Sequence, residues 1–325
     1  MDLEPNELEV DLAAGVKRLC EGRFPMSVVR AHMESGIVER SRWRELADAG
    51  VFSLRLRESE GGLGLEMTHA GVVFQELGRA LVPGPLVATH LAAGLIDGAT
   101  TGDAIVGLIE DTDGPVLVEH LDSLDALLVL RADGLYRVDP RSLSGRLIER
   151  PLDAATPLTE IAAIPVGTKL GDATLAALVR RDGACLTSAL LVGIAHAATA
   201  LATEYAKHRE QFGRPIGSFQ AVKHLLADML SRAEVARAAV DAACATVDHP
   251  EVGNPDLSVS AAKVLASEAA LLNGKSGIQV HGGMGFTWEV DAQLFLKRAW
   301  VLETHFGSVD AHTETLAVLT FNNPR

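Results

Sequence analysis

Two stretches of the chain place a hydrogen-bonding side chain next to glycines, between predicted helices. The first runs from Arg209 to Gln220 (REQFGRPIGSFQ), and the second runs from Gln279 to Phe286 (QVHGGMGF). Helix N-termini and glycine-rich turns let backbone N–H groups approach a phosphate closely, and an arginine adds a charge-assisted contact to the same group. The two stretches therefore indicate binding of a phosphate-bearing ligand. Each one alone also fits a plain turn or a solvated charge at a helix end.

The charge balance excludes two classes of partner. The 325 residues include 43 acidic and 29 basic side chains, which gives a net charge of −14. Nucleic acids and anionic membrane surfaces are recognised by basic faces, so neither is expected as a partner. Only 4% of the residues are aromatic. A core built mostly from alanine, leucine and valine favours closely packed helices.

The sequence contains no pattern typical of a metal centre, a disulfide framework or a targeting segment. Its three cysteines are widely spaced and form no CxxC or Cys/His cluster; they are Cys20, Cys185 and Cys244. We therefore expect reduced thiols and a cytoplasmic protein. The acidic start, residues 1–4, does not resemble a signal peptide. The uncharged stretch Gly183–Thr203 is nearly long enough to span a bilayer, but its small residues and His196 favour a buried core helix.

Hydrophobic periodicity divides the chain into three regions. Residues 1–98 have the spacing of helices, and residues 182–325 predict long helices joined by short loops, as in an antiparallel bundle. In residues 99–181, short apolar runs alternate with Asp, Gly and Pro, which predicts a small antiparallel β region. This order predicts an α+β fold with three domains of those bounds.

Individual elements follow from the same pattern. Asp133-Gly134 between two apolar runs is a hairpin signal, and Thr68 is a candidate N-cap. The expected helices are 2–19, 39–49, 69–81, 86–96, a segment from 183 through Tyr205, 219–247, 257–280 and 292–319 with a break near Gly307. The expected strands are 104–109, 116–118, 126–130, 135–138 and 176–179.

In this order and spacing, the two glycine-containing stretches resemble the acyl-CoA dehydrogenase family. That family carries R-x-x-F-G-x-x-I-x-x-x-Q and later Q-x-x-G-G-x-G-F/Y in its C-terminal helical domain. Trp43–Gly50 (WRELADAG), Glu60–Gly64 (EGGLG) and Gln75–Arg79 (QELGR) look like the family's first domain. The resemblance covers residues of about 35–90 and 183–320. It implies a helical N-terminal domain, a middle β domain, here shortened, and a C-terminal four-helix bundle.

The resemblance also implies that the chain binds FAD. In the family's tetramers, the matching positions reach the pyrophosphate and adenosine end of a flavin that is held mainly by the neighbouring subunit. Carried over to this sequence, these positions are Arg209, Phe212, Gln220, Gln279 and Gly283. Ser308 matches a threonine that bonds the flavin within its own subunit.

The positions of the family's catalytic base are altered in this chain. The family oxidises an acyl-CoA to its 2,3-enoyl thioester; a glutamate removes the α-proton, and the β-hydrogen leaves as hydride to the flavin. Counted without gaps, the two places that hold this glutamate fall on Phe306 and Gly183, and neither residue can accept a proton. Asp182 is adjacent, but one residue on a helix turns a side chain by about 100°. Glu303 and Asp310 lie near the first place and have the character of solvated helix-surface carboxylates.

The middle region departs from the family as well. Family members hold the flavin ring with a T-E-x-x-x-G-S-D-like segment and a tryptophan-containing strand. Residues 99–180 contain no such segment and no tryptophan; the three tryptophans of the chain are Trp43, Trp288 and Trp300. We therefore expect this chain to lack the surface that grips the flavin ring.

These observations predict the short, non-catalytic subunit of a heteromeric α2β2 acyl-CoA dehydrogenase. It resembles the enzymes that actinobacteria use on CoA thioesters of steroid side chains. A longer partner subunit would hold the flavin ring, the acyl-CoA and the base. Two alternatives stay open: a self-sufficient homotetramer that uses Asp182 or another carboxylate as an unusual base, and a flavin-free scaffold subunit.

Overall fold

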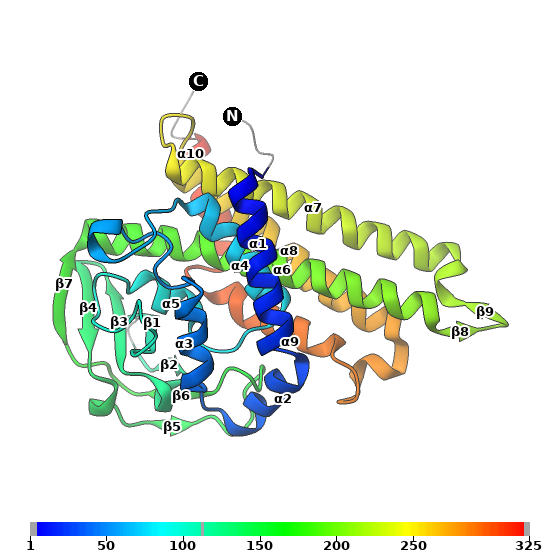
Figure 1. Cartoon of the computed structure of the whole chain (residues 1–325), viewed down its shortest axis with the longest axis horizontal. Helices are drawn as coiled ribbons and strands as arrows, with labels where there is room; N and C mark the ends of the chain where they lie inside the picture. The colour runs from blue at the N-terminus through cyan, green and yellow to red at the C-terminus, as the bar shows by residue number, and fades with distance from the viewer. Residues whose placement is uncertain (1–4, 112–113, 322–325) are drawn as a thin grey trace. The chain divides into compact units, whose positions relative to one another are not determined.

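The computed structural model describes residues 5–111 and 114–321. The helices are α1 (Glu7–Arg23), α2 (Met26–Ser35), α3 (Arg40–Asp48), α4 (Met67–Arg79), α5 (Leu86–Leu91), α6 (Ala173–His208), α7 (Gln220–Asp248), α8 (Pro255–His281), α9 (Ala292–Thr304) and α10 (Val309–Phe321) (Figure 1). The strands are β1 (Val106–Glu110), β2 (Val116–Glu119), β3 (Ala126–Arg131), β4 (Gly134–Val138), β5 (Arg146–Leu147), β6 (Leu158–Ile161), β7 (Thr168–Asp172), β8 (Glu210–Gln211) and β9 (Arg214–Pro215).

The chain forms two compact units. One consists of Met1–Glu21, Gly71–Val82 and Ala184–Arg325, and the other consists of Gly22–Ala70 and Pro83–Gly183. The first contains the long helices α7 and α8 and the greater part of α6, and the second contains both larger sheets. The division of the sequence at residues 98 and 181 stays a prediction.

Helix α8 begins where a side chain satisfies its first N–H groups. Asn254 caps α8 by accepting hydrogen bonds from the backbone N–H groups of Asp256 (2.9 Å) and Leu257 (3.2 Å), and Pro255 follows as the first helical residue. Inside the bundle, the buried Asn273 of α8 donates to the carbonyl of Met229 on α7 (2.7 Å) and to the hydroxyl of Thr199 on α6 (3.1 Å). One amide therefore links three helices.

Close backbone contact explains why the uncharged stretch of α6 is a core helix. A Cβ at Gly193 of α6 would lie 2.0 Å from the carbonyl oxygen of Gln75 on α4, and one at Gly78 of α4 would lie 2.1 Å from that of Leu190. Glycine at both places lets the two helices touch. In the described part of the chain, α6 is the one helix long and apolar enough to cross a membrane, and 78% of its most apolar window is buried within the protein. The expectation of a core helix agrees with that burial.

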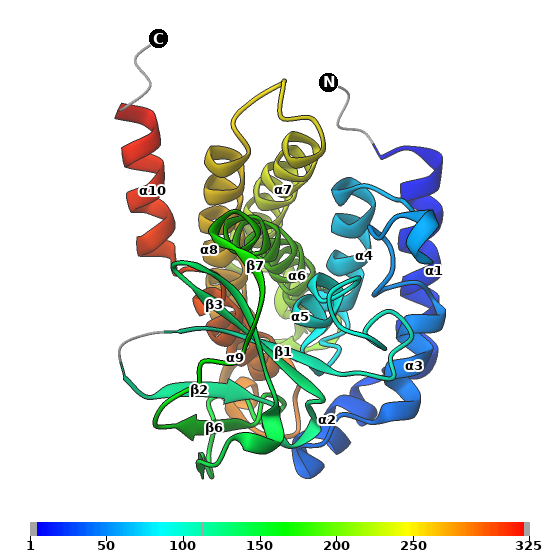
Figure 2. The same ribbon diagram turned by 90° about the vertical axis from the view of Figure 1, so that its left-hand side faces the viewer.

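The second unit contains a four-stranded sheet in the order β1-β3-β4-β7 and a three-stranded sheet in the order β2-β6-β5 (Figure 2). The predicted hairpin is confirmed, because β3 and β4 pair antiparallel with Arg131 opposite Gly134. The prediction of a wholly antiparallel region is wrong, because β1 pairs parallel with β3. After β1 the chain continues into β2, which belongs to the other sheet. It then returns as β3, which lies beside β1 and runs parallel to it.

Two local predictions need correction, and one helix was not predicted. Residues Ala176–Val179 are helical rather than a strand, because Asp172 accepts hydrogen bonds from the N–H groups of Thr174 (3.0 Å) and Leu175 (3.1 Å) and so starts α6 there. Thr68 lies inside α4, which begins at Met67, and is therefore not its N-cap. Helix α2 was not predicted, and α1 begins at Glu7, whereas the predicted start at residue 2 lies outside the described residues.

The prediction of long C-terminal helices is confirmed. Helices α7 and α8 have bounds within two residues of those expected, and the break near Gly307 separates α9 from α10. Helix α10 packs along α8, although none of its residues is buried. The predicted α+β fold, with N-terminal helices, a small middle sheet region and C-terminal helices, is thus the observed one.

Candidate functional site

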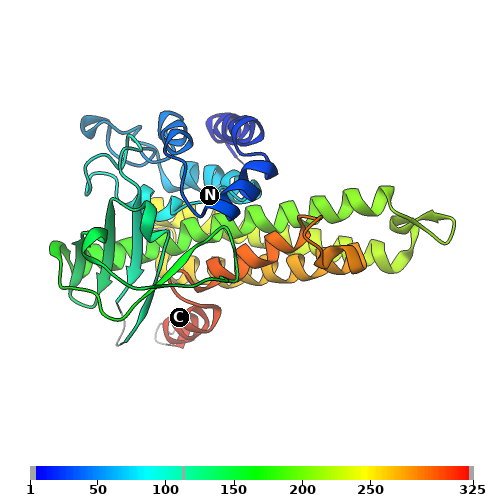
Figure 3. The ribbon, with the colours of Figure 1, turned by 90° about the horizontal axis from the view of Figure 1, so that it is seen from below.

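Both predicted ligand-binding stretches lie at one end of the bundle formed by α6, α7 and α8. Helix α6 ends at His208, the hairpin β8–β9 follows, and α7 begins at Gln220. At the same end, the ring of Tyr205 on α6 stacks on that of His281 on α8 with centroids 4.2 Å apart. Figure 3 shows the hairpin projecting beyond the helices at this end. The structure therefore brings together two stretches that are about 60 residues apart in the sequence.

The hairpin tip presents an aromatic ring to solvent. Phe212 and Gly213 occupy the two turn positions with φ angles of 56° and 77°, the left-handed region that a two-residue hairpin turn requires. Phe212 is 92% exposed, and its ring contact among the described residues is a T-shaped approach to Phe219, at a centroid distance of 6.1 Å. The Arg214 guanidinium lies 4.1 Å from the centre of that second ring. The hairpin thus carries an exposed phenylalanine with an arginine nearby.

The donors suited to a phosphate surround this hairpin. Among the described residues, the guanidinium of Arg209 makes no hydrogen bond or ion pair, and it is exposed. Phe219 offers no side-chain cap to α7, so the first N–H groups of this 29-residue helix stay open, with the positive end of the helix dipole behind them. Gln220 is exposed at that helix start. These groups have the chemistry that binds a pyrophosphate.

The glycine stretch adds an open backbone surface. Gln279 is exposed in the last turn of α8, and Gly282 follows with a φ angle of 60°. A Cβ on Gly282 or Gly283 would meet no atom within 4 Å, so a ligand can approach the backbone there. The five predicted contact positions, Arg209, Phe212, Gln220, Gln279 and Gly283, are therefore all on elements that meet at this end, and all five are exposed.

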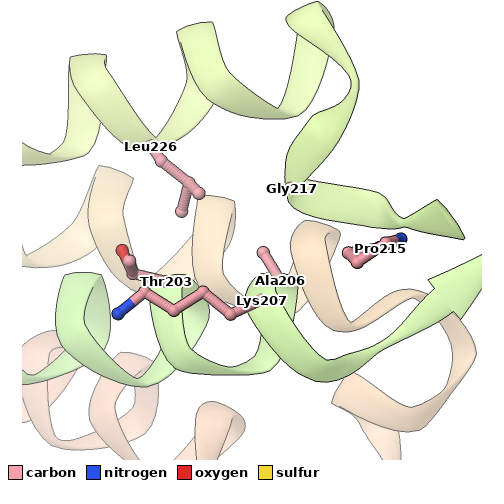
Figure 4. A pocket seen from close by; sticks show the side chains of 6 residues that line it. All are labelled: Thr203, Ala206, Lys207, Pro215, Gly217 and Leu226. Carbon is pink, nitrogen blue, oxygen red and sulfur yellow. The ribbon is translucent and has the colours of Figure 1, made fainter.

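A cavity of about 350 Å³ lies beside the hairpin (Figure 4). It is lined by Thr203, Ala206, Lys207, Pro215, Gly217 and Leu226. Figure 4 shows Thr203 and Lys207 on α6 facing Leu226 on α7. The Lys207 ammonium is paired with Glu204 on the same helix (3.2 Å). The walls are mostly apolar; they include Pro215 and Gly217 of the hairpin stretch but none of the predicted contact residues.

The position that matches the family's base lies in the turn between α9 and α10. Phe306 is 8% exposed, has a φ angle of 54°, and its carbonyl accepts a hydrogen bond from Nε2 of His312 (2.9 Å). Ser308 caps α10 weakly, since its hydroxyl accepts from the N–H of Ala311 at 3.3 Å. Glu303 is committed to the N–H of Val309 (2.8 Å). The residue that the sequence matches to the family's base is thus a buried apolar ring that cannot accept a proton; the match itself stays a prediction.

Asp182 is held between two arginines. One carboxylate oxygen lies 2.9 Å from the guanidinium of Arg55, and the other accepts hydrogen bonds from Arg181 at 3.0 and 3.1 Å. The side chain is 13% exposed. Since both oxygens are occupied by strong charge-assisted partners, this carboxylate is poorly arranged to accept a proton from carbon. Gly183, the matched base position, is buried and has no side chain.

A histidine near this cluster is kept neutral. His90 is buried and donates from Nδ1 to the carbonyl of Val51 (2.8 Å). Burial, reinforced by the positive charge of Arg55, lowers the pKa of His90 to about 4. Its ring therefore adds no charge to the two arginines at neutral pH.

Comparison with known proteins decides the family. Residues 6–102 match the N-terminal domain of acyl-CoA dehydrogenase, and residues 182–318 match its C-terminal domain. The acyl-CoA dehydrogenase IpdE2 of Mycobacterium tuberculosis is 38% identical over 288 residues, which cover 84% of this chain and 85% of that protein. The chain belongs to the acyl-CoA dehydrogenase family.

Solved structures agree with this assignment. A chain of the ChsE4-ChsE5 complex from Mycobacterium tuberculosis superposes with a TM-score of 0.85 over 100% of both chains, at 22% identity. A chain of the Tcur3481-Tcur3483 steroid acyl-CoA dehydrogenase, in a G363A variant, superposes with a TM-score of 0.83 at 25% identity, over 97% of this chain and 98% of that one. This acyl-CoA dehydrogenase is thus an FAD-dependent oxidoreductase by family and fold.

The residues at the hairpin end fit the pyrophosphate and adenosine half of FAD. The uncapped start of α7, the open glycine backbone after α8 and the unpaired Arg209 suit the pyrophosphate and adenosine end. Of the three tryptophans, Trp43 is a core residue, 1% exposed and packed against Phe52 with centroids 4.7 Å apart, whereas Trp288 and Trp300 are exposed. None of them lies in residues 99–180, where the resemblance expects the ring-holding tryptophan.

Proposed function

We propose that this chain is the short subunit of a heteromeric acyl-CoA dehydrogenase that carries out 2,3-desaturation of an acyl-CoA thioester. A longer partner subunit of the same family supplies the flavin-ring surface, the acyl-CoA site and the base. This chain supplies the second wall around the pyrophosphate and adenosine end of the partner's FAD, through Arg209, Gln220, Gln279, Gly283 and the ring of Phe212.

Phe212 is the observation that carries this proposal. A phenylalanine with a φ angle of 56° is unfavourable by roughly 1–2 kcal/mol, and 92% exposure adds the penalty of leaving a large apolar ring in water. Within the described chain the ring has one edge contact, with Phe219. We infer that a residue that is unfavourable on both counts serves to bind something outside the chain, and that an adenosine or a partner surface buries its ring.

The need for a partner follows from the chemistry. Removing the α-proton requires a base within reach and polarisation of the thioester carbonyl. Bound FAD supplies the hydride acceptor. The two matched base positions are Phe306 and Gly183, and Asp182 is bonded by two guanidinium groups. The proton-accepting carboxylate is therefore expected on another subunit.

The relatives suggest the kind of partner and substrate. IpdE2 is 38% identical, and the ChsE4-ChsE5 structure is a complex of two different subunits. The Tcur3481-Tcur3483 structure is named a steroid acyl-CoA dehydrogenase. We extend both features to this chain, which gives a heterotetramer acting on a steroid-derived acyl-CoA. The described cysteines are free and buried, which suits a reducing cytoplasm.

Coexpression with a longer acyl-CoA dehydrogenase subunit from the same genome tests the proposal. We expect a yellow complex that turns over acyl-CoA, whereas the short chain alone retains no FAD. Arg209→Met in the complex should weaken FAD binding about tenfold, the size of one lost charge-assisted contact. Arg18→Met, which changes another exposed arginine of the same compact unit, is the matched control. Full flavin occupancy and turnover by the short chain alone would contradict the proposal.

Asp182→Asn separates the heteromer from the homotetramer. The heteromer predicts little loss of rate, whereas a homotetramer that uses this carboxylate as its base would lose nearly all activity. A colourless but stable complex with the longer subunit would instead favour the flavin-free scaffold.

A further inference from the structure

An aromatic stack joins the two stretches that carry the candidate contact residues. The ring of Tyr205 on α6 lies on that of His281 on α8, with centroids 4.2 Å apart and an angle of 27° between the ring planes. Arg209 follows Tyr205 by one helical turn, and its backbone N–H donates to the Tyr205 carbonyl at 2.8 Å. His281 directly precedes Gly282 and Gly283. The stack therefore adjoins both groups of candidate contacts, within one compact unit.

His281 is buried at a helix end whose other residues are open to solvent. It is the last residue of α8 and 4% exposed, whereas Gln279, Gly282 and Gly283 are exposed. Its Nδ1 donates to the carbonyl of Gly277 at 2.7 Å; a carbonyl only accepts, so this nitrogen carries the proton and the ring is held in one plane. The stack on α6 is thus part of what buries a ring at an otherwise exposed end.

Each stretch is seated on the helix that precedes it. The N–H of Ile216 donates to the carbonyl of Arg209 at 2.7 Å, so the hairpin closes on the end of α6. A Cβ at Gly285 would lie 2.6 Å from the carbonyl oxygen of Ile278, so the turn after α8 folds back closely onto that helix. The spacing between the two stretches is therefore set by how the ends of α6 and α8 are held together.

The stack is nearer to the candidate site than the polar link between the same two helices. Asn273 of α8 donates to the hydroxyl of Thr199 on α6, and it lies eight residues before His281. At 1.5 Å per helical residue, that link is roughly 12 Å farther back along the bundle. Helix ends separate more easily than helix interiors, so a contact at the ends themselves fixes their spacing best.

We propose that Tyr205 and His281 are positioning residues for the cofactor site: their stack sets the spacing between Arg209 and the Gly282–Gly283 backbone. The inference rests on the proposed function, in which both groups bind one pyrophosphate. A ligand that is bound from two sides binds more weakly when those sides are not held in advance at the distance it needs. The two rings would thus act on FAD through the groups that follow them in the sequence.

The test uses titration of FAD into the flavin-free complex with the longer subunit. Tyr205→Leu removes one ring, and His281→Asn removes the other while keeping a donor for the Gly277 carbonyl. Tyr205→Phe keeps the stack and loses only the hydroxyl. Tyr136→Leu removes the other tyrosine of the chain, on β4 in the other compact unit, and is the matched control. Urea unfolding of each variant reports its loss of stability.

We expect Tyr205→Leu and His281→Asn each to weaken FAD binding about fivefold, the size of one lost aromatic pair. Tyr205→Phe and Tyr136→Leu should bind FAD as the wild type does. If Tyr205→Leu loses stability but binds FAD as well as Tyr136→Leu, the stack is merely structural and the inference is wrong. A loss in Tyr205→Phe equal to that in Tyr205→Leu would also overturn it, because the hydroxyl would then be the active group.

A double variant shows whether the stack acts through Arg209. In the Arg209→Met background, Tyr205→Leu should weaken FAD binding by less than about twofold, because the group that it positions is already absent. Equal losses in the two backgrounds would refute the positioning role. If Tyr205→Leu does not assemble, the same criteria are applied to His281→Asn.

The single variants keep the two proposals apart. If Arg209→Met leaves FAD binding unchanged, the proposed function fails and this inference fails with it. If Arg209→Met weakens FAD binding while Tyr205→Leu and His281→Asn match Tyr136→Leu, the proposed function stands and the role of the stack is refuted.

Discussion

Phe212 and Phe306 have nearly the same backbone conformation, with φ angles of 56° and 54°, in opposite surroundings. Phe212 is 92% exposed at the tip of the β8–β9 hairpin, where the two-residue turn itself demands a left-handed residue. Phe306 is 8% exposed, and its turn is held by hydrogen bonds from Lys263 and His312. Hairpin register maintains the strain in one case, and buried polar contacts maintain it in the other.

The difference separates two kinds of functional position. The hairpin leaves its ring and the neighbouring Arg209 without internal partners among the described residues beyond Phe219, so it is arranged to bind something outside the chain. The α9–α10 turn satisfies its groups internally and buries the ring of Phe306. We propose that the hairpin end contributes to a shared site, whereas the α9–α10 turn is held in shape by contacts within the chain.

Replacement of the buried ring should have the largest effect on stability. Phe306→Gly removes a buried phenylalanine, which costs about 3–5 kcal/mol, and relieves about 1 kcal/mol of left-handed strain. We expect the free energy of unfolding to fall by about 3 kcal/mol, measured by urea denaturation with circular dichroism. A loss below about 1 kcal/mol would mean that the ring is not part of the core, and the contrast with Phe212 would disappear.

The pH dependence of Lys263 is the next largest effect. Its pKa is lowered from 10.5 to about 8 in the folded chain, where Glu303 of α9 and His312 of α10 face the same turn. Between those pH values the unfolded chain holds a proton that the folded chain has released. Stability therefore rises with pH through this window, by up to about 1.4 kcal/mol per pH unit. Below pH 8 the lysine is protonated in both the folded and the unfolded chain, so its contribution to the free energy of unfolding no longer changes with pH.

Comparison with Lys263→Met isolates that contribution, because other groups titrate alike in both proteins. Urea unfolding at pH 8.5 and pH 10 should show the wild type gaining about 2 kcal/mol relative to the variant. Equal pH slopes in the two proteins would show that the ammonium is not buried in the way the structure describes.

The sequence was most informative where local signals and tertiary structure agree. Helices α7 and α8 are flanked by glycine, proline and asparagine, and α8 begins at Pro255 after the Asn254 cap, so their bounds were predicted closely. The five candidate contact residues were found from two motifs, and the bundle places them at one end. Their contact with FAD stays a prediction.

Predictions from the sequence were least accurate where long-range packing determines the secondary structure or the strand pairing. Residues Ala176–Val179 form an apolar run that fits a strand or a helix, and the Asp172 cap makes it a helix. The parallel pairing of β1 and β3 depends on a departure into a second sheet, which no local pattern encodes. Lys263 was overlooked because a single lysine in a long helix is normally solvated. Its one available signal was a charge at an apolar position of α8.

The glycines that follow the two phenylalanines offer a matched pair. A Cβ at Gly307, where φ is 102°, would lie 2.9 Å from Nε2 of His312 and would disturb its bond to Phe306. A Cβ at Gly213, where φ is 77°, meets no atom within 4 Å. We expect the free energy of unfolding, measured by urea denaturation, to fall by about 2 kcal/mol in Gly307→Ala. In Gly213→Ala, where backbone strain is the only cost, it should fall by about 1 kcal/mol. Equal losses would show that the α9–α10 turn can yield without loss, contrary to its network of hydrogen bonds.

The smallest change in stability, with the opposite sign, is expected at the hairpin tip. Phe212→Gly removes the left-handed strain and an exposed apolar ring, so the free energy of unfolding should rise by less than about 1 kcal/mol. In the complex with the longer subunit, the same variant should bind FAD several-fold more weakly, because the ring no longer covers the adenosine end. Arg18→Met, which changes an exposed residue of the same compact unit, is again the control. A variant that is both more stable and fully able to retain FAD would leave the strained, exposed phenylalanine without any function at this site.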